Sequence, residues 1–156
     1  MPEPLRPETQ RVAFVSTRIA GTDGVSLEIA KWAHVIEKMG VECHYITAES
    51  DRPDARTALI DEAHFNHPEI LDVSRRAFES ERRNSELTND IMRLSRVIRD
   101  PLTTALKERE IDVVIAQNAL TIPMNLPLGI AIVQAVQESG VTCVAHHHDF
   151  YWERPR

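Results

Sequence analysis

A run of histidines followed by an aspartate, near the end of the chain, carries the side chains best suited to acid–base chemistry. His146, His147 and His148 are consecutive, and Asp149 follows them directly. Side chains alternate along an extended segment, so His146 and His148 face one side and His147 faces the other. A His-Asp pair at a strand end is typical of a polar substrate cleft, because histidine moves protons near neutral pH.

Two other interpretations of this run stay open. His146, His148 and Asp149 could ligate zinc, as in a small metal-dependent hydrolase. Elsewhere the sequence has no cluster of cysteine and histidine with ligand spacing, so we expect no metal and no cofactor. Alternatively, one or two of the histidines are hydrogen-bonded, partly buried residues with no chemical role.

A second candidate site is the glycine turn formed by Gly21, Thr22, Asp23 and Gly24. Glycines before a helix let backbone N–H groups approach an anion, and the helix dipole favours negative charge there. The spacing is neither the G-x-G-x-x-G dinucleotide fingerprint nor a Walker loop. The structural alternative is a plain turn in which Asp23 or Ser26 caps the helix.

A third candidate is Asn118, which directly follows an apolar strand-like run. The loop after it holds two prolines, and a rigid loop suits a preorganised site. Asn125 near the end of this loop could cap the next helix, with Pro127 as an early helical residue. Asn118 has no such structural explanation, so we interpret it as a binding residue.

The periodicity of apolar residues predicts the elements that position these groups. Strand-length apolar runs alternate with segments whose apolar residues recur every three or four positions. This order predicts an α/β fold: a Rossmann-like three-layer α/β/α domain with a mostly parallel sheet of about four strands. Strands are expected over 11–17, 41–47, 111–117 and 141–146, and helices over 25–39 and 127–139.

In such a sheet, ligands bind outside the carboxyl ends of the strands. The loops over residues 18–24, 118–125 and 147 onward leave those ends, so we expect them to meet. Residues 48–83 are harder to interpret, and we expect a long loop followed by a short helix that starts at Pro68. A helical face resumes from Leu87, and Asp100-Pro101 should kink or split that helix.

Composition limits the class of protein. The 156 residues make one domain, and a net charge of −6 argues against a nucleic-acid partner. No apolar run reaches the length of a membrane span, and residues 1–10 form a polar, flexible leader rather than a signal peptide. Cys43 and Cys143 are too few for a disulfide framework, so we expect a cytoplasmic protein in which both are small buried residues.

Three motifs taken together resemble the N-terminal part of the family 4 (group 1) glycosyltransferases. They are RIAGTDGVSLE at residues 18–28, NALTIPMNLPLGIA at residues 118–131 and HHHDFYWERPR at residues 146–156. The resemblance covers residues 11–156. It implies a GT-B enzyme, in which two Rossmann-like domains face each other, and a retaining transfer that needs no metal. The N-terminal domain of such an enzyme binds the acceptor, and the C-terminal domain binds the nucleotide-sugar.

The resemblance also implies roles for the candidate residues. Gly21 and Gly24 match the family's glycine loop at the cleft. His148 and Asp149 match the pair that approaches the donor sugar, and we take them as catalytic. Asn118 matches a polar loop on the acceptor side.

The 156 residues end where the resemblance implies that a donor-binding C-terminal domain should begin. We therefore expect residues 11–156 to be a truncated acceptor-side domain of a hexosyltransferase that is inactive alone. Its donor would reach the site only through the missing domain. An exposed sheet edge would favour a homo-oligomer. The alternative function is a stand-alone flavodoxin-like module that binds a small anion.

Overall fold

The computed structural model describes residues 10–79 and 82–153. Most of the leader expected over residues 1–10 lies outside the described residues. Gln10 is described, and its carbonyl accepts a hydrogen bond from the N–H of Glu42 at 3.0 Å.

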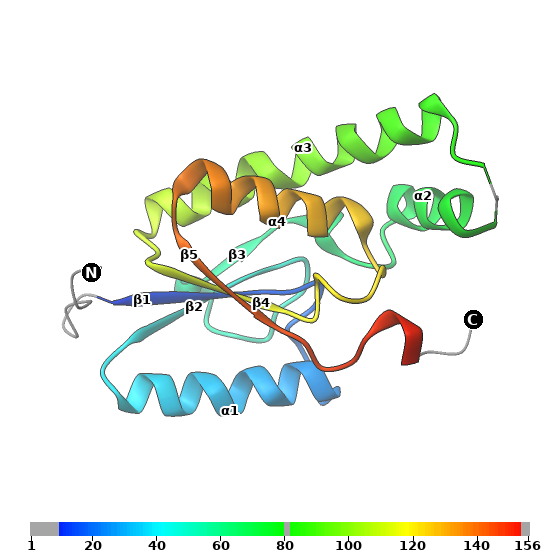
Figure 1. The fold of residues 1–156 in the computed structure, drawn as a ribbon. Coiled ribbons are helices and arrows are strands. Elements are labelled where there is room, and N and C mark those ends of the chain that lie inside the picture. The colour runs from blue at the N-terminus through cyan, green and yellow to red at the C-terminus, as the bar shows by residue number, and fades with distance from the viewer. Residues whose placement is uncertain (1–9, 80–81, 154–156) are drawn as a thin grey trace.

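Five strands form one sheet, in which every neighbouring pair is parallel (Figure 1). Their order across the sheet is β3-β2-β1-β4-β5. The chain therefore builds outward from β1 on one side and then returns to its other side, which makes the β1–β4 junction the topological switch point. The strands are β1 (Arg11–Val15), β2 (Glu42–Thr47), β3 (Thr57–Leu59), β4 (Val113–Gln117) and β5 (Thr142–His146).

Helices cover both faces of the sheet, which confirms the α/β Rossmann-like class. Helix α1 (Gly24–Lys38) lies on one face, and α3 (Ser85–Glu108) and α4 (Leu126–Ser139) lie on the other (Figure 1). Helix α2 (Pro68–Glu79) packs beside α3.

The core has a layer on each face because successive strand residues point in opposite directions. In β1, Val12 and Phe14 pack with the α1 layer, whereas Ala13 and Val15 pack with the α3 and α4 layer. All four are buried. A strand covered on both faces needs an unbroken apolar sequence, which is what residues 12–15 provide.

The fifth strand, β3, was missing from the predicted sheet of about four strands. It lies within residues 48–83, where we expected a loop, between two short 3-10 turns at Asp54–Arg56 and Asp61–Ala63. Three residues are too few to show a period, and Leu59 is exposed. Pairing with β2 defines this strand, and that pairing is a tertiary contact. Helix α2 does begin at Pro68, as predicted.

Asp100-Pro101 was predicted to kink or split a helix, and the structure shows no split. Helix α3 runs without interruption over 24 residues and contains Pro101. Proline removes one backbone hydrogen bond and crowds the preceding turn. Buried residues on either side of it, Ile98 and Leu102, hold both halves against the core. Their burial offsets the local cost at Pro101.

Residues that the sequence analysis proposed as helix caps do cap helices in the structure. Asp23 caps α1 and Asn125 caps α4 through side-chain oxygens that accept backbone N–H bonds. Gly140 ends α4 with a φ of +72°, a conformation that favours glycine.

Within the described residues, no helix has both the length and the apolar character that a bilayer crossing requires. Cys43 is buried and Cys143 half-buried, and neither forms a disulfide. Burial raises the pKa of the Cys43 thiol to about 12, so this residue behaves as a small apolar side chain.

Candidate functional site

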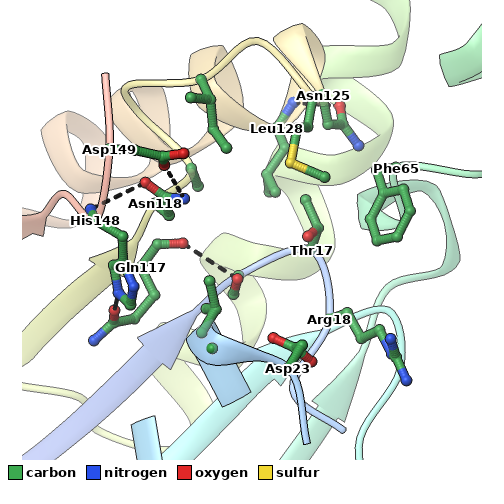
Figure 2. Close-up of a pocket in the computed structure, with 16 residues that line it drawn as sticks. Thr17, Arg18, Asp23, Phe65, Gln117, Asn118, Asn125, Leu128, His148 and Asp149 are labelled. Carbon is green, nitrogen blue, oxygen red and sulfur yellow. Dashed lines mark hydrogen bonds between the residues drawn. The ribbon is translucent and has the colours of Figure 1, made fainter. Parts of the chain in front are cut away.

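Three loops meet in one pocket at the carboxyl end of the sheet, as the strand order requires (Figure 2). The pocket has a volume of about 480 Å³ and lies at the β1–β4 switch point. Its walls come from the ends of β1 and β4, the start of α1 and the segment after β5. The lining residues are Ser16, Thr17, Arg18, Asp23, Gly24, Val25, Phe65, Gln117, Asn118, Ala119, Ile122, Met124, Asn125, Leu128, His148 and Asp149.

The structure brings most of the predicted site residues together. Five of them line the pocket: Asp23, Gly24, Asn118, His148 and Asp149. Gly21 and Thr22 belong to the same loop but are not among the lining residues.

Asn118 joins the two loops at the β4 side of the pocket. Its Nδ2 donates to Asp149 Oδ1 at 2.9 Å, and its Oδ1 accepts from the backbone N–H of His148 at 3.1 Å. Its own N–H donates to the carbonyl of His146 at 2.9 Å. Asn118 has a φ of +56°, a left-handed conformation that asparagine tolerates better than most residues. It therefore positions the segment that carries His148 and Asp149 (Figure 2).

His148 is bonded through its ring to a residue that the sequence did not single out. Its Nε2 lies 2.8 Å from Oε1 of Gln117, a residue that is 1% exposed at the end of β4. An amide oxygen only accepts, so Nε2 carries a proton. Burial lowers the pKa of His148, and the nearby His146 lowers it further. The imidazole is therefore neutral at pH 7.

The imidazole of His148 is the end of a row of three aromatic rings. The ring centroids of His146 and His148 are 4.7 Å apart, and those of His146 and Trp32 of α1 are 4.5 Å apart, with the rings tilted in both pairs. His147 is bonded elsewhere, through Nδ1 to the hydroxyl of Thr121 at 2.8 Å. The alternation predicted for the histidine run is thus present. Among the described residues, no three His, Cys, Asp or Glu side chains are grouped so that they could hold a metal ion.

Two carboxylates of the protein itself already accept hydrogen bonds from backbone N–H groups at the glycine turn. Asp23 accepts from the N–H of Ser26 at 3.0 Å and from its hydroxyl at 2.7 Å. Burial disfavours the charge on Asp23, but the Ser26 bonds hold its pKa below the ordinary value. The N–H of Gly21 donates to Asp51 Oδ2 at 2.8 Å. The capping alternative for Asp23 is therefore correct, and it coexists with the position of Asp23 in the pocket wall.

Sequence reasoning missed several lining residues, of which Arg18, Phe65 and Gln117 carry the clearest chemical character. Gln117 left a usable signal, because it is a polar residue that ends an apolar strand at its carboxyl end. Arg18 is likewise a polar residue after an apolar strand, in this case β1. Phe65 left none, because it reaches the pocket from the irregular segment between β3 and α2.

Sequence comparison now gives these observations a context. The chain is 25% identical over 154 residues to a mannosylglucosylglycerate synthase of Petrotoga mobilis, an alignment that covers 92% of this chain. It is 31% identical over 147 residues to the mannosylglucosylglycerate synthase of Thermotoga maritima, again across 92% of this chain. The chain is a sequence relative of glycosyltransferases.

That relationship confirms the resemblance of the sequence motifs to glycosyltransferases. The chain spans about a third of the length of these relatives, since each alignment covers 33% of the longer protein. Among solved structures, the glycosyltransferase SnogD from Streptomyces nogalater matches with a TM-score of 0.42 and 15% identity, over 90% of this chain and 46% of that one. No protein-family model matches the chain.

Proposed function

We propose that this domain binds the acceptor in a glycosyltransferase that uses a nucleotide-sugar donor. One observation carries the proposal: a pocket at the switch point of the sheet whose lining includes His148, Asp149 and Asn118, in a chain related along 92% of its length to two glycosyltransferases. A pocket of about 480 Å³ is of the size that holds small molecules. The proposal includes a separate donor-binding domain, a cytoplasmic location and no metal cofactor.

The names of the relatives suggest the class of acceptor. Both are mannosylglucosylglycerate synthases. We propose that the acceptor here is likewise a small glycosylated hydroxy acid, and that the transfer retains the anomeric configuration. In this reaction an acceptor hydroxyl oxygen bonds to the anomeric carbon, the carbon's bond to the nucleoside diphosphate breaks, and the hydroxyl proton leaves with the diphosphate.

The site residues take distinct roles in this proposal. His148, held through Gln117, contacts the transferring sugar or its leaving phosphate. Asp149, held through Asn118, lies beside it and keeps the local charge negative. The turn from Gly21 to Gly24 contributes backbone N–H groups other than that of Gly21, which donates to Asp51.

A direct assay tests the proposal. The full-length protein that carries this domain is incubated with glucosylglycerate and a panel of donors that includes GDP-mannose and UDP-glucose. We expect sugar transfer with one donor, retention of configuration in the product by NMR, and no loss of rate with EDTA. Replacing His148 by Ala should lower kcat by about 100-fold or more, the usual contribution of a positioned acid–base or polar group.

His147 provides the matched control for this substitution. It is the neighbouring imidazole and is bonded to Thr121 outside the pocket lining, so His147→Ala should leave kcat near the wild-type value. A normal kcat in His148→Ala would refute the role given to that residue. Absence of transfer with every donor would refute the transferase proposal and favour the small-anion binding module.

A further inference from the structure

We infer that Arg18 binds the carboxylate of an acidic acceptor, and this inference rests on the proposed function. Arg18 lies in the loop after the carboxyl end of β1, and it lines the pocket. None of the other described lining residues is a lysine or an arginine. Arg18 is therefore the permanent positive charge of the pocket wall.

The backbone holds Arg18 at a fixed place. The next residue, Ile19, is fully buried, and its N–H donates to the carbonyl of Glu49 at 2.8 Å. On the other side, Gly21 leaves room for the guanidinium: a Cβ added to Gly21 would lie 3.1 Å from Nη2 of Arg18. The glycine at position 21 thus leaves space for the guanidinium of Arg18.

The hydrogen-bond donors of Arg18 are largely uncommitted. Its recorded partner is Glu49, whose Oε2 lies 3.3 Å from Nε as an ion pair. Nε itself is buried and has no hydrogen bond of good geometry. Arg109, by contrast, donates to the carbonyls of Ala55 and Thr57 at 2.9 and 2.7 Å. Arg18 therefore keeps both Nη groups for a ligand.

The positions of the charged side chains around the pocket indicate how a bound acceptor would be oriented. Figure 2 shows Arg18 on the side of the pocket opposite His148 and Asp149. Asp23, which lies on the Arg18 side, accepts hydrogen bonds from Ser26, and the positive charge of Arg18 also helps to hold the pKa of Asp23 low. A guanidinium pairs with a carboxylate through two parallel N–H bonds, which a neutral group cannot replace. An acceptor with its carboxylate on Arg18 would extend its sugar toward His148.

Two acceptors that differ in one group test this inference. Glucosylglycerate carries a carboxylate where glucosylglycerol carries a neutral hydroxymethyl group. In the full-length protein, Arg18→Met should lower kcat/KM for glucosylglycerate by about 50-fold, mainly through KM, in line with the loss of a charge-assisted pair. The same variant should change kcat/KM for glucosylglycerol less than threefold. With glucosylglycerate, Arg18→Lys should have a kcat/KM between those of the wild type and Arg18→Met.

Arg75→Met is the matched control, because Arg75 is an exposed arginine of α2 that pairs with Asp72 and is not a lining residue of the pocket. Arg75→Met should leave kcat/KM unchanged for both acceptors. An equal loss on both acceptors in Arg18→Met would show a merely structural role, and no loss on glucosylglycerate would show no role. Either result overturns the inference.

A binding measurement separates this inference from the proposed function. The 156-residue chain is titrated with glucosylglycerate by calorimetry, as wild type and as Arg18→Met. If no transfer occurs but the wild type binds the acid and the variant does not, the carboxylate subsite stands while the transferase proposal fails. If the wild-type chain does not bind the acid, or the variant binds it equally well, the inference fails.

Discussion

At the scale of single residues, the charge state of His148 governs how the site responds to pH. Burial and the neighbouring imidazole of His146 both act against protonation, whereas Glu28 and Asp149 favour it. The net effect lowers the pKa of His148 below its ordinary value of 6.5. The neutral ring, with Nε2–H bonded to Gln117, is consequently the form present at physiological pH.

This environment predicts the pH profile of the proposed reaction. We expect kcat to fall as the pH drops through the lowered pKa of His148, because the neutral imidazole is then lost. His146→Gln removes the imidazole that helps lower this pKa, so the pKa should rise and the acid limb should move to higher pH. Rate profiles and NMR titration of labelled histidine measure both effects. An unchanged acid limb in His146→Gln, with His147→Gln as control, would contradict the prediction.

At the scale of elements, Asn125 ties the start of α4 to a distant loop. Its Oδ1 caps the helix by accepting from the N–H of Leu128 at 3.0 Å. Its Nδ2 donates to the carbonyls of Glu62 and Ala63 at 2.9 and 3.0 Å. Because Asn125 is 3% exposed, water does not readily replace these bonds.

Asn125→Ala should therefore lower the free energy of unfolding by more than the loss of an ordinary helix cap does. A cap contributes about 1 kcal/mol, and two carbonyls left without a donor add about 1–2 kcal/mol, so the free energy of unfolding should fall by about 2–3 kcal/mol. Asn84 is the matched control, since it caps α3 through Leu87 from an exposed position. Asn84→Ala should cost about 1 kcal/mol. Urea denaturation of both variants makes the comparison, and equal losses would contradict the prediction.

At the scale of the whole molecule, the two edges of the sheet differ. Strand β3 is only three residues long, whereas β5 presents five residues at the opposite edge. Val144 of β5 is 42% exposed. Among the described residues, the core layer under α1 takes members from β1, β2 and β4 but none from β5. An uncovered apolar edge strand is a template for pairing with another chain.

We therefore expect the 156-residue chain to self-associate through β5. Light scattering over a concentration series should show a rising mass. Val144→Lys should restore the monomer, because a lysine on an edge strand opposes pairing. Val35→Lys is the matched control, since Val35 is 57% exposed on α1 and should leave association unchanged. A wild-type chain that stays monomeric at every concentration would disprove this role of the edge.

The sequence alone determined the features that depend on local chemistry and periodicity. The apolar runs of β1, β2, β4 and β5 and the helical faces of α1 and α4 are readable because burial repeats every two or three to four residues. Parallel strands place their carboxyl ends on one edge, so the meeting of the loops after β1, β4 and β5 also followed. The likeness to glycosyltransferases depended on the sequence motifs in and around these loops.

Only the tertiary structure decided which side chains meet. Strand β3 exists because it pairs with β2, and α3 passes Pro101 because buried neighbours hold it. The ring of His148 bonds to Gln117, and the side chain of the next residue, Asn118, accepts from the backbone N–H of His148. Such contacts join residues far apart in the chain, and no local pattern encodes their geometry. The use of Arg18 as the pocket's cation depends in the same way on where Gly21 and Glu49 lie around it.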